Sequence, residues 1–342
     1  MKNKRNYGID IARLLAMFMV VLLHNLSNGG ILQFDNTSLE NMSFWIIENL
    51  SIVAVNLFAL ITGFLMVGHS INPKRLISLW IEVWFWSVAV TLLIFWITNS
   101  FDIKVLIKSM FPVLFKGYWY FNAYIVLYFL IPFLNSGFEL IEFSKLKKLI
   151  YCLIILSVTV GFIGNLFEEE GYSALWLIIL YLIGAIIRKI KDEGKRRIHK
   201  DFFLGMYFLG ACISLIGEIV SIKYIGHTGH WLSYNSPIIL FQSVALFIYL
   251  VQIDINNTYF QKVLKWASPL SFAVYLIDTN QQFFNFYHGK LSFITKYSLE
   301  IGLPILIVIS ILLFILFIFL GFVRVSIFRC FSLLKSKKNR IL

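Results

Sequence analysis

Charged residues are scarce in this chain of 342 residues. Asp, Glu, Lys and Arg make up 14% of it, hydrophobic residues make up 59%, and the mean hydropathy is +0.80. A soluble domain is usually about 25% charged and about half apolar. A chain with so little charge cannot cover itself with polar surface. The composition therefore excludes a soluble globular domain and a disordered chain, and it indicates an integral membrane protein.

Cysteines and acidic residues are also few. The three cysteines, Cys152, Cys212 and Cys330, are scattered and form no Cys-x-x-Cys motif, which excludes a disulfide-stapled secreted domain. The 18 acidic residues are outnumbered by 30 Lys and Arg, so the formal net charge is +12. A basic balance can indicate a nucleic-acid partner, but positive charge retained in cytoplasmic loops explains it without one. We expect no nucleic-acid partner.

Long apolar runs are what the sequence has in abundance. A helix that spans a bilayer needs about 20 predominantly apolar residues. Proline, glycine and charge divide the chain into ten such runs, so we expect an all-α polytopic membrane protein with about ten transmembrane helices. The runs cover residues 8–27, 43–67, 76–98, 118–134, 149–167, 172–188, 202–222, 237–252, 268–287 and 298–322.

The basic residues alternate between the segments that join these runs. With the N-terminus inside, 23 of the 30 Lys and Arg fall on inside segments and six on outside ones, while Arg13 lies within the first run. Cytoplasmic loops carry an excess of Lys and Arg. Both termini are therefore expected in the cytoplasm. The first run follows a basic stretch but is no signal peptide, because Asp10 and Arg13 interrupt it and no small-residue cleavage site follows.

Ionisable residues within a membrane span are costly, and they mark candidate functional positions. The first run contains Asp10, Arg13 and His24. Eleven helical residues from Arg13 to His24 are about three full turns and about 16 Å, so both side chains project from one face. Asp10 lies one turn before Arg13 and can pair with it. The other embedded candidates include Glu82, Glu218 and Asp278.

Two interpretations of this face remain open. In the structural one, Asp10 and Arg13 form an interfacial ion pair and His24 caps the outer end of the helix. In the functional one, Arg13 binds an anionic group near the cytoplasm, and His24 acts as a general base or a transient acceptor near the outer side. His227 and His230 share an outer loop without a Cys or carboxylate, so we expect no metal site.

Five segments, in order along the chain, resemble the integral-membrane acyltransferase-three family. The first span is similar to the family's opening helix, in which ten residues separate an Arg from a His. The five segments read IDIARLLAMFMVVLLH (9–24), NLFALITGFLM (56–66), PKRLISLWIEVWFWS (73–87), GYWYFNAYIVLYFLIPFL (117–134) and LSFAVYLIDTN (270–280).

Three positions depart from the family pattern. Ser78 stands where many members have another arginine, and Glu82 stands where a proline is common. Asp278 replaces the histidine that usually ends the late segment. The first departure weakens a clamp of several arginines, and the last leaves a carboxylate that could accept a proton or orient an imidazole.

The resemblance implies a single acyltransferase domain over residues 1–342, with a cytoplasmic basic tail at about 323–342. It implies transfer of an acyl group, usually acetyl, from cytoplasmic acetyl-CoA to a hydroxyl of a cell-surface or lipid-linked polysaccharide at the plasma membrane. The expected partners are thus the bilayer, acetyl-CoA and the glycan acceptor. The expected catalytic residues are His24 and Asp278, the donor-binding residues are Arg13, Lys74 and Arg75, and the substrate-binding residues are Asp10, Trp119, Tyr120, Tyr124 and Tyr275.

Other interpretations of the same features are kept. Trp119, Tyr120 and Tyr124 lie near the outer end of the fourth run, where aromatic side chains commonly form an interfacial belt rather than a sugar platform. A transporter of a polysaccharide or lipid-linked sugar could also embed Arg, Glu and Asp, although no inverted repeat is apparent. A binding protein that has lost catalysis is the third class, because Asp278 departs from the family pattern.

Overall fold

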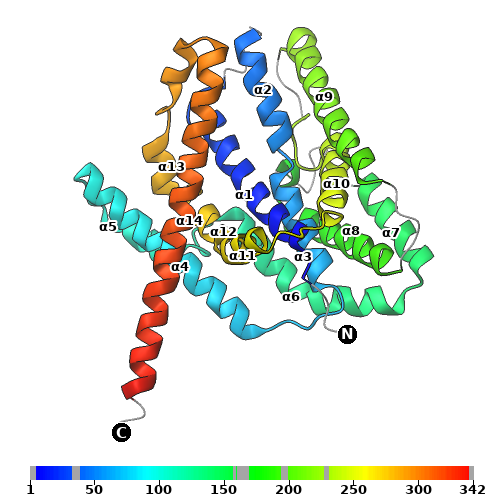
Figure 1. The fold of residues 1–342 in the computed structure, drawn as a ribbon, viewed down its shortest axis with the longest axis horizontal. Coiled ribbons are helices and arrows are strands. Elements are labelled where there is room, and N and C mark those ends of the chain that lie inside the picture. Colours follow the sequence, from blue (N-terminus) through cyan, green and yellow to red (C-terminus); the bar gives the residue numbers. More distant parts are fainter. Residues whose placement is uncertain are drawn as a thin grey trace.

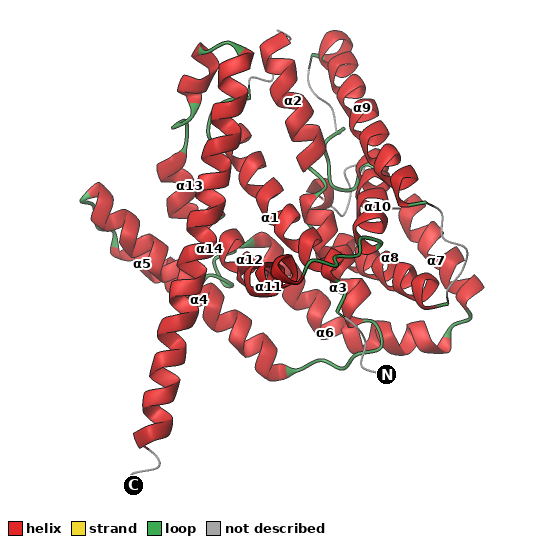
Figure 2. Ribbon diagram, viewed as in Figure 1, coloured by secondary structure: helices red, strands yellow, loops and turns green. Residues whose placement is uncertain are grey.

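The computed structural model describes residues 5–32, 39–156, 159, 169–193, 199–226 and 231–338. These residues form helices and the loops between them, with no β-strand among them, so the expected all-α class is confirmed (Figure 2). The α-helices are α1 (Tyr7–Ser27), α2 (Leu39–Ser51), α3 (Ala54–Met66), α4 (Pro73–Thr98), α5 (Ile103–Met110), α6 (Trp119–Leu140), α7 (Phe143–Leu156), α8 (Ala174–Asp192), α9 (Lys200–Ile225), α10 (Pro237–Val251), α11 (Thr258–Ala267), α12 (Ser271–Asp278), α13 (Gln281–Tyr287) and α14 (Leu299–Lys338).

Six helical stretches in the described part of the chain are long and apolar enough to cross a bilayer. They are Tyr7–Ser27, Met42–Met66, Pro73–Thr98, Trp119–Leu140, Lys200–Tyr224 and Leu299–Arg329. The protein therefore has several membrane-spanning helices, while the number ten and the cytoplasmic termini stay predictions. The fifth expected run is described only as far as the end of α7 and at residue 159.

Two of the expected runs are broken into separate helices. The second run divides at a turn between Ser51, which ends α2, and Ala54, which begins α3. The ninth run, 268–287, divides after Asp278, where α12 ends. The Asn280 side chain accepts hydrogen bonds from the first backbone amides of α13 and so starts a new helix there. Asp278 thus lies at a helix end rather than in the middle of a span.

Helix α1 lies within the bundle, between α2 and α3 on one side and α12 and α14 on the other (Figure 1). Its buried side is rich in small and apolar residues. Helices α3 and α8 cross closely, because Gly63 lies against the backbone of α8 and Gly184 lies against the backbone of α3. Any larger side chain at either glycine would meet that backbone. The close crossing fixes α3 against α8, and α3 also packs against α1.

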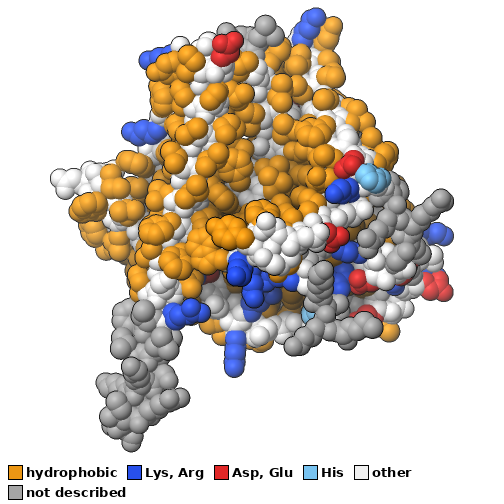
Figure 3. Space-filling view, viewed as in Figure 1, with side chains coloured by type: hydrophobic (Ala, Val, Ile, Leu, Met, Phe, Trp, Pro, Cys, Tyr) orange, Lys and Arg blue, Asp and Glu red, His pale blue; other side chains and the backbone are white. Residues whose placement is uncertain are grey.

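The outer surface agrees with a protein embedded in lipid. Hydrophobic side chains cover most of the face in Figure 3, and most Lys and Arg in that view gather toward the side where α14 ends. Helix α1 begins and α14 ends on this same side of the bundle (Figure 1). A partly buried ion pair joins α14 to α4, with Arg324 Nη2 lying 2.9 Å from Glu82 Oε1.

Candidate active site

Two polar regions lie along α1, one around Arg13 and one around His24. The helix is continuous from Tyr7 to Ser27, so the expected separation of about 16 Å along its axis holds. Asn6 starts the helix by accepting a hydrogen bond from the Gly8 amide. The two regions are thus mounted on one rigid element.

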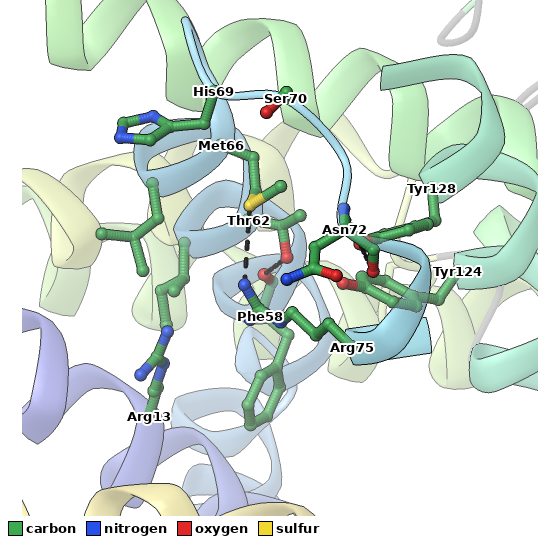
Figure 4. A pocket seen from close by; sticks show the side chains of 12 residues that line it. Arg13, Phe58, Thr62, Met66, His69, Ser70, Asn72, Arg75, Tyr124 and Tyr128 are labelled. Carbon is green, nitrogen blue, oxygen red and sulfur yellow. Dashed lines mark hydrogen bonds between the residues drawn. The ribbon is translucent and has the colours of Figure 1, made fainter. Parts of the chain in front are cut away.

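The first region is a cavity of about 290 Å³ that Arg13 of α1 and Arg75 of α4 enter from two sides (Figure 4). Its volume lies near the lower limit for small-molecule sites, so it suits one end of a long ligand. Two guanidinium groups favour an anionic occupant, because planar N–H forks bind phosphate and carboxylate well. The lining residues are Arg13, Phe58, Ile61, Thr62, Leu65, Met66, His69, Ser70, Asn72, Arg75, Tyr124 and Tyr128.

Arg75 is positioned by the beginning of α4. The Asn72 side chain accepts a hydrogen bond from the Lys74 amide, and Pro73 occupies the first helical turn, as both residue types favour. Tyr128 Oη accepts a hydrogen bond from the Asn72 amide at 2.9 Å and donates one to the Asn72 carbonyl at 3.0 Å. Arg75 Nη1 lies 3.7 Å from Met66 Sδ. Lys74 is exposed and does not line the cavity.

Arg13 lines the cavity with hydrogen-bond donors that have no partner among the described residues. It is half-buried, and the described part of the chain gives it no hydrogen bond or ion pair. The expected pair with Asp10 is wrong, because Arg5 Nε and Nη2 donate to the two Asp10 carboxylate oxygens at 2.7 and 2.8 Å. These hydrogen bonds raise the pKa of the Arg5 guanidinium. Arg13 is therefore left available to a ligand, and Asp10 is engaged.

The second region joins His24 to Asp278. His24 Nδ1 lies 2.6 Å from Asp278 Oδ2, although 254 residues separate them in the sequence. The Asp278 side chain is 3% exposed, whereas that of His24 is 27% exposed. A carboxylate oxygen accepts, so the proton of a neutral imidazole lies on Nδ1 and leaves the Nε2 lone pair free. This is the arrangement that a general base needs.

Helix α13 covers His24 from another side. The ring of Phe284 meets the His24 ring edge-on, with 5.5 Å between centroids. Asn28, just after α1, donates to the Phe284 carbonyl at 2.8 Å and accepts from the Gly289 amide at 2.8 Å. His288 Nδ1 lies 3.0 Å from the side-chain oxygen of Asn28. The end of α1 and α13 are thus fastened together around the imidazole.

Three of the expected substrate-binding aromatic residues are in ring contact, because Tyr120 lies 5.6 Å from Trp119 and 6.1 Å from Tyr275 between centroids. Tyr124 lines the arginine cavity, whereas Trp119 packs beside Tyr172 and Tyr234 with centroid distances of 4.5 and 6.1 Å.

Between the two polar regions runs a row of three aromatic rings. Tyr120 lies between Phe58 and Tyr275, with centroid distances of 6.3 and 6.1 Å. Phe58 lines the cavity, and Tyr275 lies one turn before Asp278 on α12. The row therefore leads from the arginine cavity to α12, the helix that ends at Asp278.

Comparison with known protein families decides what this arrangement belongs to. The family model described as an acyltransferase domain matches residues 6–329. The chain belongs to the acyltransferase-three family. Searches of curated proteins and of solved structures each found no match. The protein is thus a multi-pass membrane acyltransferase, and both polar regions lie inside the family-matched segment.

Some residues of this acyltransferase site escaped prediction. Tyr128 follows Tyr124 by four residues, so helical periodicity places both on one face and could have added Tyr128 to the cavity. Asn28 and Phe284 carry no recognisable motif, and only their contacts reveal them. His227 and His230 lie outside the described residues.

Proposed function

We propose that this acyltransferase moves an acetyl group from cytoplasmic acetyl-CoA to a hydroxyl of a cell-surface or lipid-linked polysaccharide at the plasma membrane. The observation that carries the proposal is the hydrogen bond of 2.6 Å between His24 and Asp278. His24 lies on the same helix as Arg13, which has no hydrogen-bond or ion-pair partner among the described residues. A transporter that performs no chemistry has no evident need of an imidazole whose Nδ1 is held by a buried carboxylate.

Arg13 and Arg75 suit the anionic end of the donor. Coenzyme A carries phosphates, and two converging guanidinium groups with no acidic residue among the cavity lining residues would attract them. The cavity is too small for the whole donor, so its long and narrow arm would extend away from the arginines. We assign Lys74 only a weak electrostatic contribution, because, unlike Arg75, it does not line the cavity.

The aromatic row indicates a route between the two regions. Phe58, Tyr120 and Tyr275 lead from the cavity toward Asp278. A thioester arm extended along these rings would cross the separation of about 16 Å between Arg13 and His24 and bring its carbonyl near His24. We keep Tyr275 and Tyr120 as candidate substrate contacts on this basis, and we place Tyr124 with the donor.

His24 then has a defined task. Its free Nε2 takes the proton of the acceptor hydroxyl as that oxygen attacks the thioester carbonyl. Asp278 keeps the ring in the required tautomer and balances the positive charge that the ring acquires. When the intermediate collapses, the imidazolium returns the proton to the departing thiolate.

Purified protein in lipid nanodiscs tests this function directly. We expect release of free CoA from acetyl-CoA in the presence of a glycan acceptor, and loss of this release in His24→Ala. NMR of surface glycans from cells with and without the protein would show the corresponding O-acetyl groups. Transport of a labelled lipid-linked sugar without CoA release would instead favour an exporter, and CoA binding without turnover would favour an inactive binding protein.

A further inference from the structure

The hydroxyl of Tyr287 is buried beside the candidate active site and has no hydrogen-bond partner among the described residues. Buried hydroxyl groups nearly always have a partner, because leaving one without costs free energy. Tyr287 is the last residue of α13, the helix that covers His24. A polar atom held there without a partner calls for a functional explanation.

The position of Tyr287 follows from that of Phe284. The two residues are three apart on α13 and so project from neighbouring turns on one face. The Phe284 ring lies against the His24 ring, at 5.5 Å between centroids. Asn28 donates a hydrogen bond to the Phe284 carbonyl and accepts one from the Gly289 amide, and these two contacts fix the chain on both sides of Tyr287 to the end of α1. Tyr287 is thereby held next to the His24 region.

The ring of Tyr287 is clamped as well. It stacks on Phe283 with 5.4 Å between centroids and 13° between planes, and Phe283 meets Phe317 of α14 edge-on at 5.6 Å. Tyr287 cannot turn its hydroxyl toward solvent without breaking its stack on Phe283, which Phe317 contacts from α14. The hydroxyl is therefore preorganised, which is the property that makes a hydrogen-bond donor effective in catalysis.

The electrostatic surroundings keep this hydroxyl protonated. Burial raises the pKa of Tyr287, and the nearby negative charge of Asp278 acts in the same direction. A tyrosine that holds its proton over the working pH range can donate a hydrogen bond but cannot act as a base. Tyr287 is thus suited to stabilising a negative charge that forms during a reaction.

We propose that Tyr287 Oη donates a hydrogen bond to the oxyanion that forms when acyl transfer takes place at His24. The inference rests on the proposed function. In this step the acceptor oxygen bonds to the thioester carbonyl carbon, its proton moves to His24 Nε2, and the carbonyl π electrons move onto the oxygen that Tyr287 contacts. As the carbonyl re-forms, the carbon–sulfur bond breaks and the thiolate takes the proton from the imidazolium.

Tyr287→Phe removes this donor and keeps the stacked ring. Loss of one oxyanion donor lowers kcat by about 10²–10³-fold in other acyl-transfer enzymes. We expect a fall of this size, with the KM values for acetyl-CoA and the acceptor little changed and the pH profile of kcat unaltered in shape. Tyr297→Phe is the matched control. Tyr297 lies ten residues after Tyr287 and is 48% exposed, so the Tyr297→Phe protein should keep full activity.

Two further measurements make the outcome decisive. An inactive His24→Ala protein together with a fully active Tyr287→Phe protein would overturn the role of Tyr287 alone, whereas a fully active His24→Ala protein would overturn the proposed function. A rise in KM with kcat unchanged would also refute the oxyanion role. If Tyr287→Phe lowers the melting temperature, 3-fluorotyrosine at this position keeps the hydroxyl and makes it a stronger donor. An unchanged kcat in that protein would reject the proposal.

Discussion

Replacing Asp278 with asparagine tests the central geometry most directly. The substitution keeps the size of the side chain and removes its negative charge. Nδ1 of His24 lies 2.6 Å from Asp278 Oδ2, and the carboxylate is almost wholly buried, so solvent screens the interaction little. An asparagine that turns its NH₂ group toward Nδ1 would place the imidazole proton on Nε2, where it blocks the base.

The size of the effect follows from the contact. A hydrogen bond to a charged group contributes about 1.5–3 kcal/mol, and about 1.4 kcal/mol corresponds to a tenfold change in rate. Losing the orientation of His24 should therefore lower kcat by at least about tenfold. Complete loss of general-base catalysis sets an upper limit of about 10⁴-fold. We expect Asp278→Asn to fall between these limits.

The assay is steady-state release of CoA by purified protein in nanodiscs, with melting temperatures recorded for each variant. The chain supplies a matched control in His199 and Asp201, a His–Asp pair 3.2 Å apart whose side chains are largely exposed. Asp201→Asn should leave kcat unchanged. Full activity in Asp278→Asn, at normal abundance and stability, would refute a role for Asp278 in orienting His24.

Three other substitutions test the donor cavity and the fold. Arg75→Gln should raise KM for acetyl-CoA by about 10- to 150-fold, the equivalent of about 1.5–3 kcal/mol for hydrogen bonds to a charged group. Lys74→Gln, outside the cavity, should change this KM less than about twofold. Equal effects of the two substitutions in initial-rate measurements would contradict the cavity assignment. Glu82→Gln removes the charged partner of the partly buried Arg324 and should lower the free energy of unfolding by about 1.5–3 kcal/mol, the contribution of a hydrogen bond to a charged group. Denaturant titration in detergent measures the change, and an unchanged midpoint would speak against the pair. Gly63→Leu should abolish the monodisperse peak in size-exclusion chromatography, because the added side chain meets the backbone of α8. A normal elution profile would disprove the close crossing of α3 and α8.

Hydropathy predicted the long helices well. The first, third and eighth runs were expected at 8–27, 76–98 and 237–252, and the structure has α1, α4 and α10 there with ends that differ by at most three residues. Polar caps such as Asn6 and Asn72 mark where these helices begin. A long apolar run bounded by caps has few alternatives in a membrane.

The same measure could not detect breaks inside a run. Hydropathy averages composition over a window, and a single polar side chain hardly changes that average. Asn280 nevertheless separates α12 from α13 because its side-chain oxygen satisfies backbone amides at the new helix start. The effect is one of local hydrogen bonding, which has no counterpart in a mean hydropathy.

The parts of the candidate site that the sequence could not predict depend on contacts between residues far apart in the chain. His24 and Asp278 were each expected to matter from the resemblance to the family, but their hydrogen bond depends on how α1 and α12 pack. Residues three apart on a helix lie on neighbouring turns, and this spacing predicts an ion pair between Asp10 and Arg13. The partner in the structure is Arg5, which lies before the helix and donates to both carboxylate oxygens of Asp10. A flexible residue before a helix can thus displace the partner that periodicity indicates.

The helix end at Asp278 has one more consequence for the chemistry. The dipoles of successive peptide units sum to a partial negative charge at the C-terminus of a helix, worth about 0.3–1 kcal/mol to a nearby cation. Because α12 stops at Asp278, this charge lies at the residue whose carboxylate holds the imidazole. An uninterrupted span through this segment would have carried the partial charge to the far end of the helix. The break therefore adds a backbone field to the side-chain charge that balances a protonated His24.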